Sequence, residues 1–252
     1  MNSTAVAFAV FVCIVIGTIA GAILRTRLSD DHLQPDSKDV IKMAVGLIAT
    51  LSALVLGLLI ATAKTSFDAR SGQVRQVTSN IVLLDQLLAQ YGSEANAART
   101  ELRLGLQFMV DRIWDENRSG DKNQNPFHAS SEGATFIQGL ARLGGDDNFH
   151  RELKAKIIQV TTEIAKDRLT LYVQSSDTIS MPFLVVLTFW LTVIFAIFGL
   201  LARLNVLVAL IMLLCALSVS AAIFLILDLN RPFDGLMQIP SSQIRNALSP
   251  LN

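Results

Sequence analysis

The sequence has 252 residues, of which 52% are hydrophobic and 17% charged, and its mean hydropathy is +0.48. This composition places the chain among membrane proteins. The 21 basic residues balance the 21 acidic ones, which excludes a strong basic field for binding nucleic acid. Both cysteines, Cys13 and Cys215, lie in apolar stretches, so they say little about the redox compartment.

Four apolar runs without a charged residue predict four membrane-spanning helices, at residues 5–24, 43–63, 181–202 and 204–227. Each is long enough to cross a hydrocarbon core of about 30 Å at about 1.5 Å per residue. The first run has no basic residue before it, so we expect it to be retained as a span and not cleaved as a signal peptide. Four spans place both termini on one side of the membrane.

Taken as a whole, the sequence predicts an all-α protein with four parts. They are membrane helices one and two (1–63), a helical soluble domain (64–180), membrane helices three and four (181–227) and a C-terminal exit segment (228–252). No stretch of the soluble domain alternates as a strand does.

Helix-capping and helix-breaking residues within the soluble domain predict where its helices begin and end. The second span continues as an amphipathic helix to a stop at Tyr91-Gly92. Further helices are expected at 97–114, 131–143 and from Phe149 onward, with a polar loop at 116–130 and a short C-terminal helix entered at Ser241.

One face of the second span carries small residues at steps of three or four. They are Gly46, Ala49, Thr50, Ala53, Gly57 and Ala61. Small residues let another backbone, or a pore, approach closely. Beyond the span, Val74, Val77, Ile81, Leu84 and Leu88 keep the spacing of a helix packed along another helix.

Catalytic chemistry finds no support in the sequence. His32, His128 and His150 are isolated, and the pair His150 and Glu152 lacks a third metal ligand, so we interpret it as a surface feature. The spans contain no Asp, Glu, Lys, Arg or His for a proton relay or a charged coupling site of the transporter kind. We therefore expect no enzyme, which leaves passive permeation, or signalling and assembly.

Two short motifs resemble those of bestrophins. Thr65-Ser66-Phe67-Asp68 after the second span is similar to their N-x-S-Y-D-R-W stretch, and Asn230-Arg231-Pro232-Phe233-Asp234-Gly235 is similar to their N-x-P-F-G segment. Over nearly its whole length the chain resembles the bacterial bestrophin-like domain family, a family of unknown function whose members carry runs similar to GLIATLSALVLGLLIATAKTSFD and LLDQLLAQYG.

The resemblance implies a homo-oligomer, expected to be a pentamer, in which the second helix lines an axis for small anions such as chloride. The pore-lining residues would be Gly46, Thr50, Ala53, Gly57, Ala61, Lys64, Asp68 and Arg75. The motif residues carried over are Ser66, Phe67, Asp68, Asn230, Pro232, Phe233 and Gly235. It also implies a multi-pass protein of the cell inner membrane, with the helical domain and both termini in the cytoplasm.

The sequence departs from the bestrophin pattern at two sites. The three bulky residues that form a narrow neck in bestrophins correspond to Ala53, Gly57 and Ala61, so a neck here would be wider or absent. The calcium-binding acidic cluster is reduced to Asp228 and Asp234, which together with Asn230 could hold calcium by oxygen ligands. A turn that ends a helix needs the same residue types, and we expect no cofactor.

Two further classes of function stay open. A non-conducting membrane scaffold or signalling protein would use its helical domain to bind a partner while the spans only anchor it. An intramembrane enzyme lacks the residues it would need. A closed axis in the oligomer would favour the scaffold.

Overall fold

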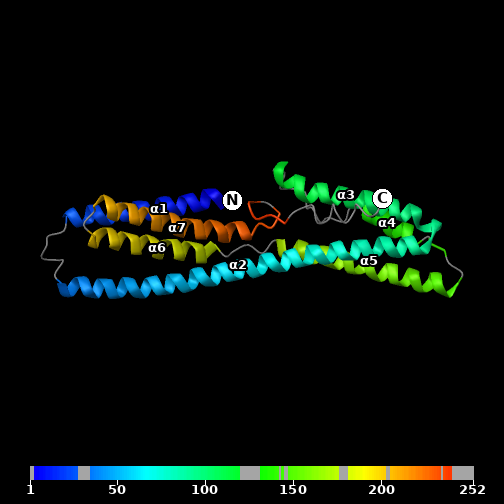
Figure 1. Ribbon diagram of the computed structural model, residues 1–252, viewed down its shortest axis with the longest axis horizontal. Coiled ribbons are helices and arrows are strands. Elements are labelled where there is room, and N and C mark those ends of the chain that lie inside the picture. The colour runs from blue at the N-terminus through cyan, green and yellow to red at the C-terminus, as the bar shows by residue number, and fades with distance from the viewer. Residues whose placement is uncertain are drawn as a thin grey trace. The chain divides into compact units, whose positions relative to one another are not determined.

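The computed structural model describes residues 3–27, 35–119, 131–141, 143–144, 147–175, 181–202, 205–233 and 235–239. All regular structure in these ranges is helical (Figure 1). The elements are α1 (Ser3–Arg27), α2 (Pro35–Tyr91), the 3-10 helix η2 (Ser93–Ala95), α3 (Asn96–Ser119), α4 (Ser131–Ala141), α5 (Asn148–Ser175), α6 (Met181–Leu201) and α7 (Val206–Leu229).

The all-α prediction and the four predicted spans are confirmed. Helices α1, α2, α6 and α7 are long and apolar enough to cross a membrane. Helix α2 has 57 residues and is about 85 Å long at the usual rise per residue. It ends at Tyr91 as predicted, because Gly92 adopts a φ of 100° that residues with a side chain avoid.

The other boundaries of the soluble helices shift by a few residues. Helix α3 extends to Ser119, so the first residues of the expected loop are helical. Helix α5 begins at Asn148, where the carboxylate of Asp147 accepts a hydrogen bond of 2.7 Å from the backbone N–H of His150. The expected C-terminal helix from Ser241 lies outside the described residues.

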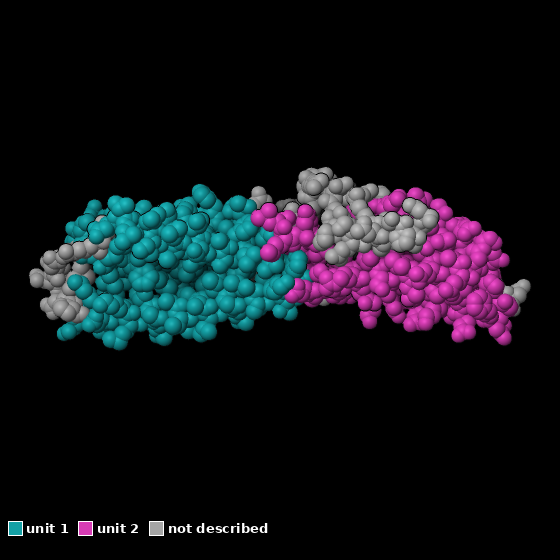
Figure 2. Space-filling view, in the orientation of Figure 1, with its two compact units in different colours: residues 1–67, 178–230 teal, residues 68–177, 231–252 magenta. Residues whose placement is uncertain are grey.

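The chain divides into two compact units (Figure 2). The membrane unit comprises residues 1–67 and 178–230, and the helical unit comprises residues 68–177 and 231–252. Helix α2 contributes its first part to the membrane unit and its second part to the helical unit.

Helices α1, α6 and α7 form the packed part of the membrane unit. Their buried cluster consists of Val10, Ile14, Leu184, Leu187, Leu191, Phe195, Ala216 and Ile223. The buried hydroxyl of Ser220 donates a hydrogen bond of 2.6 Å to the carbonyl oxygen of Ala7, which joins α7 to α1. Residue 7 still lies within α1, so this carbonyl already accepts one helical hydrogen bond and gains a second.

Glycines let α1 and α6 approach each other unusually closely. A Cβ atom on Gly17 would lie 2.8 Å from Cγ2 of Thr192, and one on Gly21 would collide with the carbonyl oxygen of Ala196. From the other side, a Cβ atom on Gly199 would collide with the carbonyl oxygen of Thr18. These positions therefore require glycine, as at close crossings of membrane helices generally.

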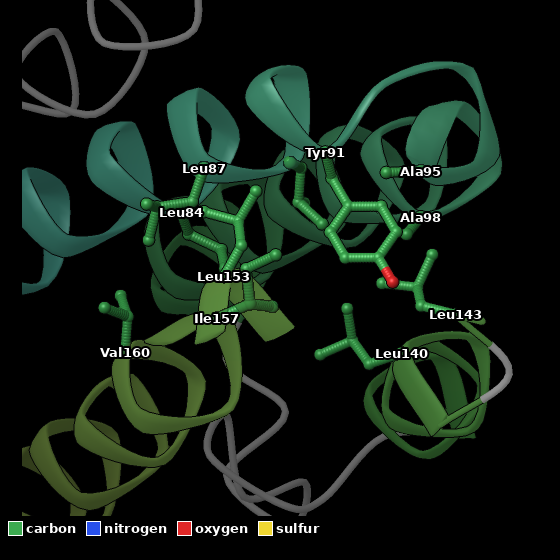
Figure 3. Close-up of a cluster of buried hydrophobic side chains, with 11 residues drawn as sticks. Leu84, Leu87, Tyr91, Ala95, Ala98, Leu140, Leu143, Leu153, Ile157 and Val160 are labelled. Carbon is green, nitrogen blue, oxygen red and sulfur yellow. The ribbon is translucent and has the colours of Figure 1, made fainter. Parts of the chain in front are cut away.

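The core of the helical unit is built on the apolar stripe of α2. All five residues of the predicted stripe, Val74, Val77, Ile81, Leu84 and Leu88, are buried, which confirms that this side packs inside the unit. In Figure 3, Leu84 and Leu87 of α2 lie in one cluster with Leu153 and Ile157 of α5.

A buried ion pair joins α2 to the start of α3. The guanidinium of Arg99 donates two hydrogen bonds to the carboxylate of Asp85, at 2.9 and 2.7 Å. The side chain of Asp85 is 3% exposed, whereas that of Arg99 is 26% exposed. These bonds raise the pKa of Arg99. Since a bare buried carboxylate is costly, Asp85 depends on this partner.

Candidate functional site

The predicted pore-lining residues lie along one face of α2, and the part of the chain that the structure describes leaves this face open. Gly46, Thr50, Ala53, Gly57 and Ala61 are all exposed. A Cβ atom added to Gly46 or Gly57 would meet no other atom within 4 Å. These five small residues of α2 therefore do not pack against other described parts of the chain, unlike the glycines of α1 and α6.

The opposite side of α2 attaches the helix to the rest of the membrane unit. Val55, Leu56 and Leu59 pack against the cluster of α1, α6 and α7. Ala63 is buried with Ile226 and Leu229 of α7. This attachment is narrow. Only 11% of the most apolar 18-residue stretch of α2 is buried, whereas the corresponding shares in α1, α6 and α7 are 28%, 33% and 22%.

The exposed surface of the α2 span has two sides of different character. Next to the small residues lies a row of large ones, Leu47, Leu51, Leu54 and Leu58, with exposed fractions of 43 to 71%. Acyl chains cover large apolar side chains at no cost, whereas small residues favour close contact with protein or space for a solute. The two sides therefore suit different surroundings.

Charged residues continue the open face of α2 past the apolar span. Lys64, Asp68 and Arg75 are exposed, and residues 64 and 75 lie about 16 Å apart along the helix at the usual rise per residue. The ammonium of Lys64 sits 5.6 Å from the ring centroid of Phe67, a cation–π contact. The guanidinium of Arg75 donates a hydrogen bond of 2.9 Å to the hydroxyl of Ser71.

The motif after the second span has a packing role in the structure. Ser66 and Phe67 are half-buried, and Phe67 packs against the cluster of Ala63, Ile226 and Leu229. Asp68 lies on the exposed side of the same turn. The motif thus places an aromatic ring against α7 while its carboxylate follows the open face.

The exit segment after α7 folds back on itself. The carbonyl oxygen of Pro232 accepts a hydrogen bond of 2.7 Å from the N–H of Ile239, and both residues are buried. Gly235 has a φ of 136°, which explains the glycine of this motif. Phe233 is half-buried in the same loop.

The residues named as calcium ligands are only partly described. Asp228 is buried at the end of α7, Asn230 follows it, and Asp234 lies outside the described residues. Among the residues that are described, no three His, Cys, Asp or Glu side chains come together as a metal site. Calcium binding here stays a prediction.

His150 belongs to a structural cluster at the start of α5. Its Nδ1 atom lies 2.7 Å from the carboxylate of Asp147, and its ring meets Tyr91 edge-on at 5.0 Å. The hydrogen bonds from His150 lower the pKa of Asp147. Burial raises the pKa of Tyr91, with a smaller contribution from the charges of Glu94 and Asp147. Glu152 lies on the exposed surface of α5.

Two features that position the site were missed by sequence reasoning. The spacing of Gly17 and Gly21 is the small-xxx-small pattern of close helix crossings, so it was a usable signal for the contact of α1 with α6. The pairing of Asp85 with Arg99 left no such signal, because charged residues on amphipathic helices are usually solvated.

Comparison with solved structures identifies the fold. The crystal structure of a point mutant of a bacterial bestrophin homolog from Klebsiella pneumoniae matches at a TM-score of 0.57 and 13% identity, covering 94% of this chain and 98% of that one. The crystal structure of a point mutant of a membrane protein matches at the same TM-score and identity, covering 99% and 98%. At this identity the likeness concerns the fold.

The sequence itself matches the family model described as Bestrophin-like domain over residues 12–244. No curated protein matches the chain.

Proposed function

This chain belongs to the bestrophin-like domain family, and we propose that it is an oligomeric membrane channel that passes small anions along an axis lined by α2. The observation that carries the proposal is the open, uncharged small-residue face of α2, with Gly46 and Gly57 facing empty space. The bestrophin resemblance supports a pentamer, and the multi-pass topology supports contact with the lipid bilayer.

The weak burial of α2 favours a position at the centre of an assembly. Its own chain buries only 11% of the most apolar 18-residue stretch of α2, the smallest share among the four spans found in the described residues. Neighbouring copies would supply the missing contacts on the flanks of the helix. The face between the flanks, with Ala53, Gly57 and Ala61, would then surround the axis.

Selectivity would come from the charges that follow the span. Pores gate by apolar constriction and select by rings of charge, and the small side chains of Ala53, Gly57 and Ala61 offer little constriction. In a fivefold assembly Lys64 would form one cationic ring and Arg75 a deeper one. Asp68 lies between them, and its one negative charge per copy offsets only part of the two positive charges.

The family resemblance also supports an orientation. We place the helical unit and both termini in the cytoplasm of a cell whose inner membrane holds the spans. The same resemblance supports transport without catalysis, because the carried-over residues line a path and form turns. Any calcium at Asp228, Asn230 and Asp234 would stabilise the exit turn by oxygen coordination.

Anion flux into liposomes tests the proposal. Wild-type protein should carry chloride, Lys64→Glu should reduce or reverse the anion preference, and Asp68→Asn should strengthen it. Gly57→Phe should block flux while the helical content stays unchanged. The matched control is Leu54→Phe on the large-residue side, where the side chain is 71% exposed and flux should persist.

The result that overturns the channel is specific. If Lys64→Glu leaves the reversal potential unchanged while Gly57→Phe still conducts, α2 does not line the path. An oligomer that carries no anion at all would instead favour the non-conducting scaffold.

A further inference from the structure

The solvent-exposed surface of α5 is divided into two sides of opposite character. One side carries the polar and charged residues Glu152, Lys156, Gln159, Glu163 and Lys166, and the other carries Ala155, Ile158, Thr162, Ala165 and Leu169. All ten residues are exposed. Consecutive members of the second set are three or four positions apart, so they form one continuous row along the helix.

This second set, the uncharged side of α5, combines two alanines, two large aliphatic residues and one threonine. Ile158 is 47% exposed and Leu169 is 62% exposed. The hydroxyl of Thr162 is satisfied within its own helix, by a hydrogen bond of 2.8 Å to the carbonyl oxygen of Ile158. On the charged side, by contrast, Gln159 donates to Glu163 at 3.1 Å.

Contact with solvent alone does not require charged and uncharged residues to lie on separate sides of the exposed surface of a helix. Amphipathic surface helices have one apolar side, which faces their own core. In α5 that side exists already, because Leu153, Ile157 and Val160 lie in the core of the helical unit. The uncharged side is a second row without a charge, and contiguous apolar surface on a soluble unit is typical of contacts with other molecules.

We infer that the uncharged side of α5 is where a second copy of this chain packs against the helical unit. The inference rests on the oligomer of the proposed function and extends it to a defined contact. A ring of identical copies needs two different patches on each copy that fit one another. The helical unit supplies a second uncharged row on α2, made of Ser79, Leu83, Gln86 and Gln90, all of them exposed.

The continuity of α2 explains why a second copy is the expected occupant. The same helix that leaves its span largely unburied continues without a break into the helical unit. Copies that meet through their α2 spans must therefore carry the second halves of these helices along with them. Ile158 and Leu169 on α5 would give such neighbours apolar surface to bury, which favours association.

Thiol labelling at paired positions tests the inference. In a background where Cys13 and Cys215 are replaced by alanine, Ile158→Cys and Gln159→Cys lie side by side on the two sides of α5, as do Leu169→Cys and Lys166→Cys. In the purified oligomer a polar maleimide should label the uncharged positions at least about tenfold more slowly, because a packed contact excludes water and reagent. Equal rates would overturn the inference.

A charge placed in the row distinguishes a contact between copies from cover by the chain itself or by the bilayer. Ile158→Glu should lower the oligomer mass measured by light scattering and restore fast labelling of Leu169→Cys, whereas Gln159→Glu should change neither. Unaltered helical circular dichroism shows that both variants fold. Slow labelling of Leu169→Cys that persists in Ile158→Glu monomers would mean that the chain covers the row itself, and protection that appears only in liposomes would assign the row to the bilayer. Either result overturns the contact between copies.

The outcome is independent of conduction. A protected row in an oligomer without anion flux would retain this interface and reject the channel. Flux through an oligomer with an unprotected row would do the reverse.

Discussion

The glycines of α1 and α6 and the glycines of α2 have opposite surroundings. Gly17 and Gly21 face the backbone of α6 so closely that a Cβ atom would not fit, whereas Gly46 and Gly57 face open space. Both pairs lie in apolar membrane helices, four positions apart in α1 and eleven positions apart in α2. A small residue can therefore serve the chain's own packing or keep a surface open. The small-xxx-small spacing, which Ala53, Gly57 and Ala61 of α2 share, signals a close approach without identifying the partner.

The helical unit repeats this contrast. Its core side is closed by the chain, with Ile157 buried and Tyr91 hydrogen-bonded through its hydroxyl to the carbonyl oxygen of Gly144 at 2.7 Å. Its uncharged row on α5 is left open, with Leu169 62% exposed. In both units, mutations in the closed regions should change the stability of the fold. Mutations in the open regions should instead change assembly or anion flux.

The largest expected effect comes from filling the crossing of α1 with α6. Gly21→Leu places a side chain where the backbone of Ala196 lies, so the helices must separate at a cost of about 3 kcal/mol or more. We expect loss of folded protein in a detergent melt. Gly57→Leu is the control and should not lower the melting temperature. Equal melting temperatures for the two variants would contradict the difference in packing between Gly21 and Gly57.

Removing the carboxylate of the buried ion pair should be the next largest effect. Asp85→Ala leaves the guanidinium of Arg99 without its two hydrogen bonds. Arg99 is 26% exposed and can regain some hydration, so we expect a loss of about 2 to 3 kcal/mol in the free energy of unfolding. Chemical denaturation measures it, with Asp68→Ala on the exposed face as the control. A loss below that of the control would show that the pair contributes nothing.

The hydroxyl of Tyr91 should have a smaller effect that depends on pH. Tyr91→Phe removes the hydrogen bond to Gly144, at a cost of about 1 kcal/mol. Because the pKa of Tyr91 is raised in the folded state above its ordinary 10.0, the protonated phenol stabilises the fold below that pH, and the contribution is lost as the pH rises through the folded pKa. Wild type and Tyr91→Phe should therefore converge in stability above pH 10. A stability gap that stays constant as the pH rises well above 10 would contradict the assignment.

The smallest effect is expected on the open face of α2. Gly57→Ala adds a Cβ atom that meets no described neighbour, so only the backbone preference for the helix changes. The free energy of unfolding should rise by at most about 1 kcal/mol. The same substitution at Gly21 should destabilise. Thermal melts of the two alanine variants give the sign directly, and a destabilised Gly57→Ala would show that a neighbouring copy already packs there.

Much of this fold is determined by local sequence. The spans follow from runs of apolar residues that only a helix can place in a bilayer, and the end of α2 follows from Gly92. The buried row from Val74 to Leu88 follows from its spacing. Each of these depends on residues a few positions apart, where periodicity and backbone preference decide the outcome.

The tertiary structure alone decided which of these surfaces are closed. The spacing of small residues is alike in α1 and α2, yet α6 packs on Gly21 and none of the described residues packs on Gly57. Asp85 reads as a surface residue and is buried because Arg99, fourteen positions away, reaches it. Such outcomes depend on which helices meet, and that is set by the summed packing of segments far apart in the chain.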